Sequence, residues 1–383
     1  MRVAVVGVGW YGFKPTVPEL SFREMMFEAA VRAYEDAGVD PRRDVDAFIS
    51  CQEDFWEGIA ISDEFAPEPI GGVLRPTMTI TGDGLQCVGQ AYMMIKSGAF
   101  NVVAVEAHAK PSDIMSPQEI YEFSLDPNIR TLKISNPLFQ AGLDAVAYMR
   151  RSGASREHLA MVAVKNKVRG LLNPRASHSA KLTLDQVLDS KPVIHPLTRY
   201  EIAGFTDVAI NVVLASEDVA RRLGDKHVWV EGIWWATEVG TGAVEWHEWG
   251  RMPSMRLAAL GAYKLAGVED PLRQTDFSEV EDRFSYMELL SLEELGLGGG
   301  GAHRMLESGY YNPEGGYPVN PSGGSLSMGV TLEATGLSRL LEVVLQLRGE
   351  AGGVQLKDVR RAVVASWRGP PTYTSIVAVV SRD

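Results

Sequence analysis

Acidic and histidine side chains follow strand-like segments of this chain, in positions that suit proton transfer. His108 stands directly after an apolar β-branched run, Glu281 and Asp282 follow another near residue 280, and Asp83 precedes an apolar helical segment. Parallel-sheet folds place their sites at strand ends, and a carboxylate in a dry pocket has a raised pKa that suits it to move protons. We therefore expect Glu281, His108 and Asp83 to be candidate catalytic residues.

Each candidate also has a structural explanation. His108 suits a hydrogen-bonded position at a subunit interface, and Glu281 suits a salt bridge to Arg283 or another arginine. Asp83 suits a helix N-cap, because a short carboxylate can accept from the first free backbone amides. The sequence leaves these alternatives open.

Hydrophobic periodicity and capping signals predict the elements that position these residues. In the first part of the chain, strands and helices alternate, which favours a mainly parallel sheet with helices on its faces. A capping box at Ser21–Glu24 starts a helix that ends at Gly38. We predict strands at 3–8, 45–50, 78–80, 102–107, 209–215, 228–233, near 280, 361–366 and 375–380, and helices at 84–96, 156–168, 254–266 and 335–347.

Two distant segments resemble each other closely. Residues 29–39 and 258–268 are identical at seven of eleven positions, and both end in Ala-Gly-Val. Each is an apolar helix with a small-residue face, followed by a glycine suited to the left-handed C-terminal position. The repeat predicts two homologous halves related by a pseudo-dyad.

Composition bounds the class of protein. The 383 residues carry a formal net charge of -12, which argues against nucleic acid as the main partner. The two cysteines, Cys51 and Cys87, cannot build a disulfide framework or a cysteine zinc site, and no other metal site is expected. The opening segment does not resemble a signal peptide, and no apolar run could span a membrane. We expect a soluble cytoplasmic protein with no membrane partner and two buried, inert thiols.

Two segments of the second part of the chain carry recognisable motifs. Residues 320–329 read Asn-Pro-Ser-Gly-Gly-Ser-Leu-Ser-Met-Gly, and residues 346–352 begin with Gln-Leu-Arg-Gly. They resemble the signature and the helix end of the thiolase superfamily, in particular of thiolases of the sterol-carrier-protein and archaeal types. Pro196-Leu197-Thr198-Arg199 with Thr206-Asp207 resembles a Pro-Leu-Thr…Asp-Gly-Ala stretch, and 281–284 stands where those enzymes have His-Asp-Cys-Phe.

The resemblance implies an α/β fold of two βαβαβαββ halves in a five-layered αβαβα sandwich, in a protein that is usually dimeric. It places the first half at 1–225, with an inserted loop domain at about 109–192, and the second at 226–383. The homodimer is expected to form through the edge of the first half's sheet.

The catalytic positions of the family carry other residues here. Thr81 stands at the cysteine nucleophile, Val330 and Glu281 at the two histidines, and Trp367 at the second cysteine. Thiolysis through a cysteine acyl-enzyme is therefore not expected. The resemblance implies that Thr81, Asn320, Gly323, Gly324, Val330 and Trp367 line the substrate site, with Tyr286, Tyr310, Tyr311 and Tyr317 nearby.

Three functions remain open. The first is an acyl-CoA enzyme of lipid metabolism that acts on a carbon–carbon bond without a cysteine nucleophile, as an acyltransferase or aldolase type. The second is a non-catalytic subunit that binds CoA esters or supports a zinc-ribbon/OB-fold partner protein. The third is an acyltransferase with a relocated cysteine, Cys51 or Cys87. Coenzyme A thioester is expected as substrate or ligand, with no covalently bound cofactor.

Overall fold

The computed structural model describes residues 1–54, 61–115, 136–238, 247–370 and 372–383. Its principal strands are β1 (Val3–Lys14), β2 (Ala47–Cys51), β3 (Thr77–Ile80), β4 (Val102–Ala109), β7 (Asp207–Ser216), β8 (Val228–Ala236), β9 (Phe277–Glu279), β10 (Arg361–Trp367) and β11 (Ser375–Ser381). The longer helices are α1 (Phe22–Ala37), α2 (Gly84–Lys96), α5 (Pro137–Ser152), α6 (Arg156–Gly170), α9 (Pro253–Ala266), α11 (Ser285–Glu294) and α14 (Thr335–Arg348). Each predicted strand and helix is present, most of them with bounds within a few residues, but β1 runs on to Lys14, and α5 and α11 were not predicted.

The nine strands form one sheet in the order β3-β2-β4-β7-β1-β8-β11-β10-β9. The expectation of a mainly parallel sheet is wrong, because only β2–β3, β2–β4 and β9–β10 pair in parallel among the described strands. The reason is that β7 enters between β4 and β1 and runs opposite to both. Strand β8 then pairs antiparallel with β1 and joins the two halves of the sheet.

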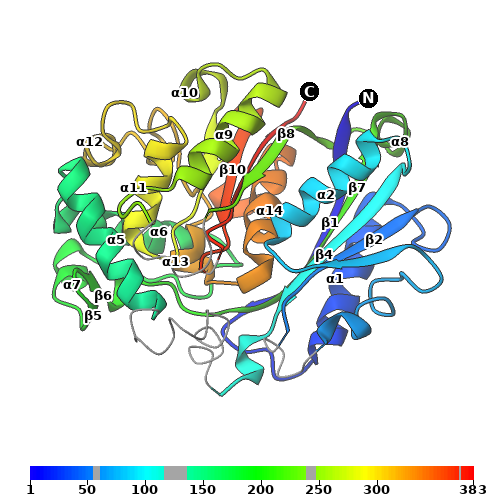
Figure 1. The fold of residues 1–383 in the computed structure, drawn as a ribbon, viewed down its shortest axis with the longest axis horizontal. Coiled ribbons are helices and arrows are strands. Elements are labelled where there is room, and N and C mark those ends of the chain that lie inside the picture. The colour runs from blue at the N-terminus through cyan, green and yellow to red at the C-terminus, as the bar shows by residue number, and fades with distance from the viewer. Residues whose placement is uncertain (55–60, 116–135, 239–246, 371) are drawn as a thin grey trace.

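Successive side chains of each strand point to opposite faces of the sheet, and helices pack on both faces of each half. The layers are therefore outer helix, first half of the sheet, central helices, second half of the sheet and outer helices. Helices α2 and α14 pack together in a central apolar cluster that receives every second side chain from both halves, such as Val103 and Val364. The intervening side chains face outward, where Ala104 packs near α1 and Val363 packs near α9 and α11. Figure 1 shows α2 and α14 between the strands of the two halves.

The two similar helices play the same part in each half. Gly38 after α1 and Gly267 after α9 are both left-handed, and Tyr34 and Tyr263 each donate to a backbone carbonyl. A Cβ on Gly232 of β8 would lie 2.2 Å from a carbonyl oxygen of α9, so the glycine lets helix and strand approach closely.

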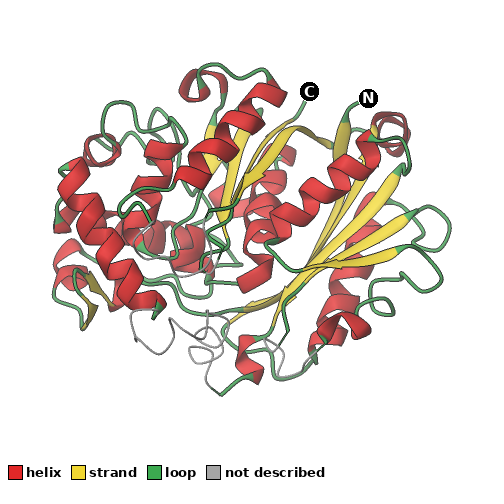
Figure 2. Ribbon diagram, in the orientation of Figure 1, coloured by secondary structure: helices red, strands yellow, loops and turns green. Residues whose placement is uncertain are grey.

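The predicted inserted segment, about 109–192, is mainly helical where it is described. It contains α5, α6 and the short helix α7 (Leu184–Leu188), and the hairpin β5 (Pro192–Ile194) and β6 (Leu197–Thr198) begins at its end; residues 116–135 of it lie outside the described residues. Figure 2 shows its helices gathered at the end of the molecule away from β1, β2 and β4. The short helices α12 (Ala302–Glu307) and α13 (Gly324–Met328) contact α6. In the described part of the chain, we find no helix with the length and apolar character needed to cross a membrane.

Candidate active site

A pocket of about 250 Å³ lies between the inserted helix α5 and the second half of the sheet. Its walls come from α5, the segment 202–205, the start of α11, the segment 330–332 and the chain after β10. Most of its lining is aromatic or aliphatic, and four polar side chains join it. The aromatic and polar members are Phe205, Trp249, Phe284, Tyr286, Trp367, Tyr373, Gln140, Asp144, His247 and Arg283.

Two of the residues expected at the substrate site line this pocket. Val330 lies where its backbone amide donates to the Gly204 carbonyl over 2.7 Å, and Trp367 ends β10. Neither side chain can exchange a proton. These two positions therefore shape the pocket, and its chemistry must come from other groups.

Asp144 is the centre of the polar wall. One carboxylate oxygen accepts from the Gly250 amide over 2.6 Å, and the other accepts from the Tyr286 hydroxyl over 3.2 Å. His247 lies between two acids, with Nε2 3.6 Å from Asp144 and Nδ1 3.8 Å from Glu238. Burial, and then the charge of Asp144, raise the pKa of Tyr286 well above its ordinary value, so its phenol stays protonated at neutral pH.

Local sequence explains how α5 reaches this wall. Asn136 caps the helix by accepting from the Leu138 amide over 2.9 Å, and Pro137 occupies the first turn. Gln140 and Asp144 are four residues apart, so both face the pocket from one side of α5. Gln140 accepts a hydrogen bond from Tyr373 over 2.9 Å.

Sequence reasoning missed Asp144 and His247. The Asn136 cap and the left-handed Gly153 that ends α5 are the signals that would have predicted this helix. His247 follows a segment that lies outside the described residues, and nothing in its sequence context indicates its partners. Of the tyrosines expected nearby, Tyr286 lines the pocket, whereas Tyr311 and Tyr317 are buried against Leu297 and Thr275.

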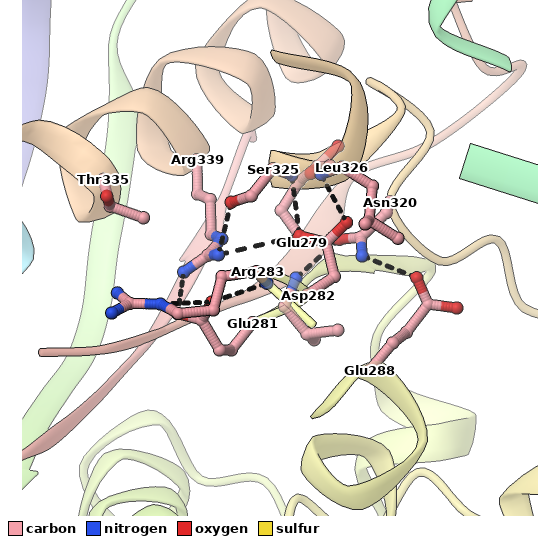
Figure 3. A network of polar contacts seen from close by, with 12 residues as sticks. Glu279, Glu281, Asp282, Arg283, Glu288, Asn320, Ser325, Leu326, Thr335 and Arg339 are labelled. Carbon is pink, nitrogen blue, oxygen red and sulfur yellow. Dashed lines mark hydrogen bonds and ion pairs between the residues drawn. The ribbon is translucent and has the colours of Figure 1, made fainter. Parts of the chain in front are cut away.

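A buried ionic cluster (Figure 3) shares Arg283 with the lining of the pocket. Glu281 pairs through one oxygen with Arg283, at 3.3 Å, and through the other with Arg339 of α14, at 3.0 Å. Burial alone would raise the pKa of Glu281, but the two guanidinium groups, Arg339 foremost, lower it to about 2. The raised pKa expected for Glu281 is therefore not found, and the alternative of an arginine salt bridge is what the structure has.

Asp282 and the loop from 320 to 324 form the other side of this cluster. Asp282 accepts from the backbone amides of Ser325, at 2.7 Å, and Leu326, at 3.2 Å, so it caps α13. Burial raises the pKa of Asp282 to about 6 although Arg339 opposes the shift. A Cβ on Gly324 would lie 2.1 Å from the Asp282 carboxylate, which explains the glycine there.

Asn320 and Gly323 are also held by protein partners. The Asn320 side chain accepts from the Val280 amide over 2.8 Å and donates to Glu288 over 2.7 Å. A Cβ on Gly323 would lie 2.8 Å from Gly170 of α6. Asn320, Gly323 and Gly324 do not belong to the lining of the pocket beside Val330 and Trp367.

Asp83 is the N-cap of α2, which is the structural explanation that the sequence offered for it. It accepts from the Leu85 amide over 2.9 Å, from the Ser366 hydroxyl over 2.7 Å and from the Gly336 amide over 3.1 Å. Burial raises the pKa of this carboxyl. Thr81, two residues earlier, is exposed, and neither residue lines the pocket.

His108 lies on the other face of the sheet. It is buried, stacks on Phe22 at 5.5 Å between ring centroids, and places Nδ1 2.9 Å from Glu106. Neighbouring Ala107 points the opposite way, into the cluster with α2 and α14. Because side chains alternate along a strand, His108 points to the face of the sheet that α1 covers. Glu281 instead contacts Arg339 of α14, so the structure does not bring His108 and Glu281 together.

The thiols of Cys51 and Cys87 are fully buried in the central cluster. Burial raises the pKa of both thiols, so the reactive thiolate is disfavoured. The expectation of buried cysteines is confirmed. In the described ranges, no group of three or more His, Cys, Asp or Glu residues is arranged to hold a metal ion.

The chain is similar to known proteins over nearly its whole length. A family model described as "Thiolase C-terminal domain-like" matches residues 241–382. An acetyl-CoA acetyltransferase of Methanothermobacter thermautotrophicus is 32% identical over 372 residues, covering 93% of each chain. The benzoylsuccinyl-CoA thiolase subunit BbsB of Thauera aromatica is 31% identical over 233 residues, covering 59% of this chain and 58% of that protein.

Among solved structures, the entire chain superposes on one titled Ltp2-ChsH2(DUF35) aldolase, with a TM-score of 0.84, 23% identity and 98% of that chain covered. This likeness concerns the fold. The 32% identity to the acetyl-CoA acetyltransferase over 93% of the chain identifies the family: the chain belongs to the thiolase superfamily.

Proposed function

We propose that this protein is an enzyme of acyl-CoA esters that makes or breaks a carbon–carbon bond by aldol chemistry, without a cysteine nucleophile. The observation that carries the proposal is the pocket in which Asp144, Tyr286 and His247 form a titratable cluster beside Val330 and Trp367. The relatives named above are a thiolase and an acetyltransferase of CoA esters, and the similar solved fold is titled an aldolase.

The chemistry needs one base and no covalent acyl carrier. In the cleavage direction, a base removes the proton of a β-hydroxyl group, the bond between the α and β carbons breaks, and a carbonyl compound leaves. The electron pair of that bond forms the thioester enolate, which then takes up a proton to give the shortened acyl-CoA. A cysteine is not required at any step.

His247 is the group best placed to act as that base. The carboxylates of Asp144 and Glu238 lie one beside each ring nitrogen of His247, at 3.6 Å and 3.8 Å. The Tyr286 hydroxyl and the Gly250 amide hold Asp144 in place. Glu281 and His108 receive no proton-transfer role in this proposal, because Glu281 is held ionised by two arginines and His108 lies on the other face of the sheet.

The test is cleavage of 3-hydroxy-3-phenylpropionyl-CoA, followed through release of benzaldehyde and acetyl-CoA. His247→Gln should lower kcat by roughly 100-fold or more. His303→Gln is the matched control, because His303 packs edge-on against His158 and does not line the pocket, and it should leave turnover unchanged. Unaltered turnover in His247→Gln, or its loss in Cys87→Ala, would contradict the proposal.

A second candidate is a CoA-ester-binding subunit that needs a partner. The observation in its favour is the similar solved structure, whose title pairs the thiolase-fold chain with a DUF35 protein. Under this alternative, the isolated chain binds the CoA ester with no turnover. Measuring binding and turnover on one sample, with and without a purified DUF35-type or zinc-ribbon/OB-fold protein, separates the two candidates.

A further inference from the structure

Arg283 places a positive charge in the wall of the pocket, most of whose lining is aromatic or aliphatic. It follows Glu281 and Asp282 and precedes α11, and its side chain is only 11% exposed. Its neighbours in the lining include Phe284, Val330 and Trp367. A guanidinium in such surroundings is unfavourable unless acceptors satisfy it.

The protein satisfies one part of the guanidinium. The Nε atom lies 3.3 Å from Glu281, and Nη2 donates to the Trp367 carbonyl over 2.9 Å. The indole ring of Trp367 lies 5.2 Å from the guanidinium carbon, within range of a cation–π contact. Glu281 is itself shared with Arg339, which also lies 3.7 Å from Asp282.

The Nη1 atom of Arg283 has no acceptor. Within the described part of the chain, no hydrogen bond involves its two N–H groups, although the other arginine nitrogens are engaged. Figure 3 shows the end of this guanidinium directed away from Arg339 and Asp282. Two N–H donors of Arg283 therefore remain on the pocket side of the ionic cluster.

We propose that Arg283 selects CoA esters whose acyl chain carries a second, free carboxylate. A planar guanidinium matches a carboxylate in geometry and charge, and such charge-assisted hydrogen bonds are the stronger kind. The pocket has room for the chain, because about 250 Å³ exceeds a cavity of roughly 150 Å³ that holds benzene. The inference takes one point from the proposed function, namely that the ligand is a CoA ester.

The experiment compares two esters of equal chain length, adipyl-CoA and hexanoyl-CoA, which differ in a terminal carboxylate or methyl group. Binding is followed by the fluorescence of Trp367 and Trp249 in the pocket lining. We expect the wild-type protein to bind adipyl-CoA roughly 10- to 100-fold more tightly. Arg283→Met should reduce this ratio to about one, and Arg283→Lys should keep part of it.

Arg256→Met is the matched control, since Arg256 of α9 is 53% exposed and does not line the pocket. It should keep the full preference. Equal binding of both esters by the wild-type protein overturns the inference without need of any variant. A preference that survives in Arg283→Met also overturns it.

Binding separates this inference from the proposed function. If adipyl-CoA is preferred but no ester turns over, the proposed reaction fails and the role of Arg283 stands. If Arg283→Met abolishes turnover while wild-type binding shows no preference, Arg283 serves the thioester oxygen instead and the inference is wrong.

Discussion

Arg339 of α14 donates to the Glu281 carboxylate over 3.0 Å, and both side chains are buried. The same nitrogen of Arg339 donates to Ser366 over 3.1 Å, and the Ser366 hydroxyl donates to Asp83 over 2.7 Å. These bonds connect the cap of α2 in the first half to Arg283 in the pocket wall. Glu281 is thus part of an ionic core that joins the two halves.

The first prediction concerns this pair. Glu281→Gln leaves Arg339 buried without its main counter-charge, so the free energy of unfolding should fall by about 3–5 kcal/mol. Urea denaturation at pH 7 measures it. Glu307→Gln, at a side chain that is 68% exposed, should change stability by less than about 1 kcal/mol.

The pH dependence gives a second measurement of the same pair. Because the folded pKa of Glu281, about 2, lies below its ordinary 4.5, its contribution is full above pH 4.5 and is lost as the pH falls toward 2. Wild-type stability should exceed that of Glu281→Gln by a margin that narrows across this window. A margin that is constant from pH 5 to 2.5 would contradict the ion pair.

The fold was largely predictable because its signals are local. The capping box at Ser21, the glycine after α1 and the β-branched run of β7 specify their elements without reference to distant residues. The parallel sheet was predicted wrongly because strand order depends on long-range pairing. Nothing near β7 in the sequence indicates that it inserts between β4 and β1.

The site was less predictable for the same physical reason. Val330 and Trp367 stand at positions that the family resemblance points to, and both line the pocket. The pairing of Asp144 with Tyr286 links residues 142 apart and depends on how α5 packs. Likewise, the pKa of Glu281 depends on Arg339, and burial alone would have shifted it the other way.

Glu279 of β9 should give stability the opposite pH dependence. Burial, and then the charge of Glu342, raise its pKa to about 8, although Ser322 donates to it twice. The folded state therefore binds more protons between pH 4.5 and 8, so stability falls as the pH rises through this window, by at most about 1.4 kcal/mol per pH unit. Urea unfolding at several pH values measures the slope.

In Glu279→Gln, the fall in stability with rising pH should disappear, because a neutral amide replaces the protonated acid. The Ser322 hydroxyl can turn to accept a hydrogen bond from this amide. The variant should become progressively more stable than the wild-type protein from pH 5.5 to 8. Glu68→Gln, at a side chain that is 72% exposed, should follow the wild-type curve. Parallel curves for Glu279→Gln and the wild-type protein would show that Glu279 is already ionised.

The thiols should be inert in the folded protein. Cys51 and Cys87 are fully buried and their thiolates are disfavoured, so iodoacetamide should modify them only in urea, as measured by mass spectrometry. Acetoacetyl-CoA thiolysis should stay far below the roughly 1–1,000 per second of ordinary enzymes. Acyl-thioester formation on either cysteine would show that the relocated-cysteine alternative is correct.

The last prediction is a homodimer through β3, the edge strand of the first half. Phe48 of β2 donates to Pro76 and Gln52 donates to Ile80, so the even-numbered positions face β2 and Thr79 turns its backbone outward. An exposed edge of this kind can pair with a second copy of the strand. Light scattering at low micromolar concentration should give twice the 41.8 kDa of one chain.

Thr79→Pro removes the outward N–H without touching the β2–β3 ladder and should give a monomer, whereas Thr79→Val keeps that N–H and should remain dimeric. A monomeric wild-type protein, or a Thr79→Pro variant that still dimerises, would show that this edge is not the interface.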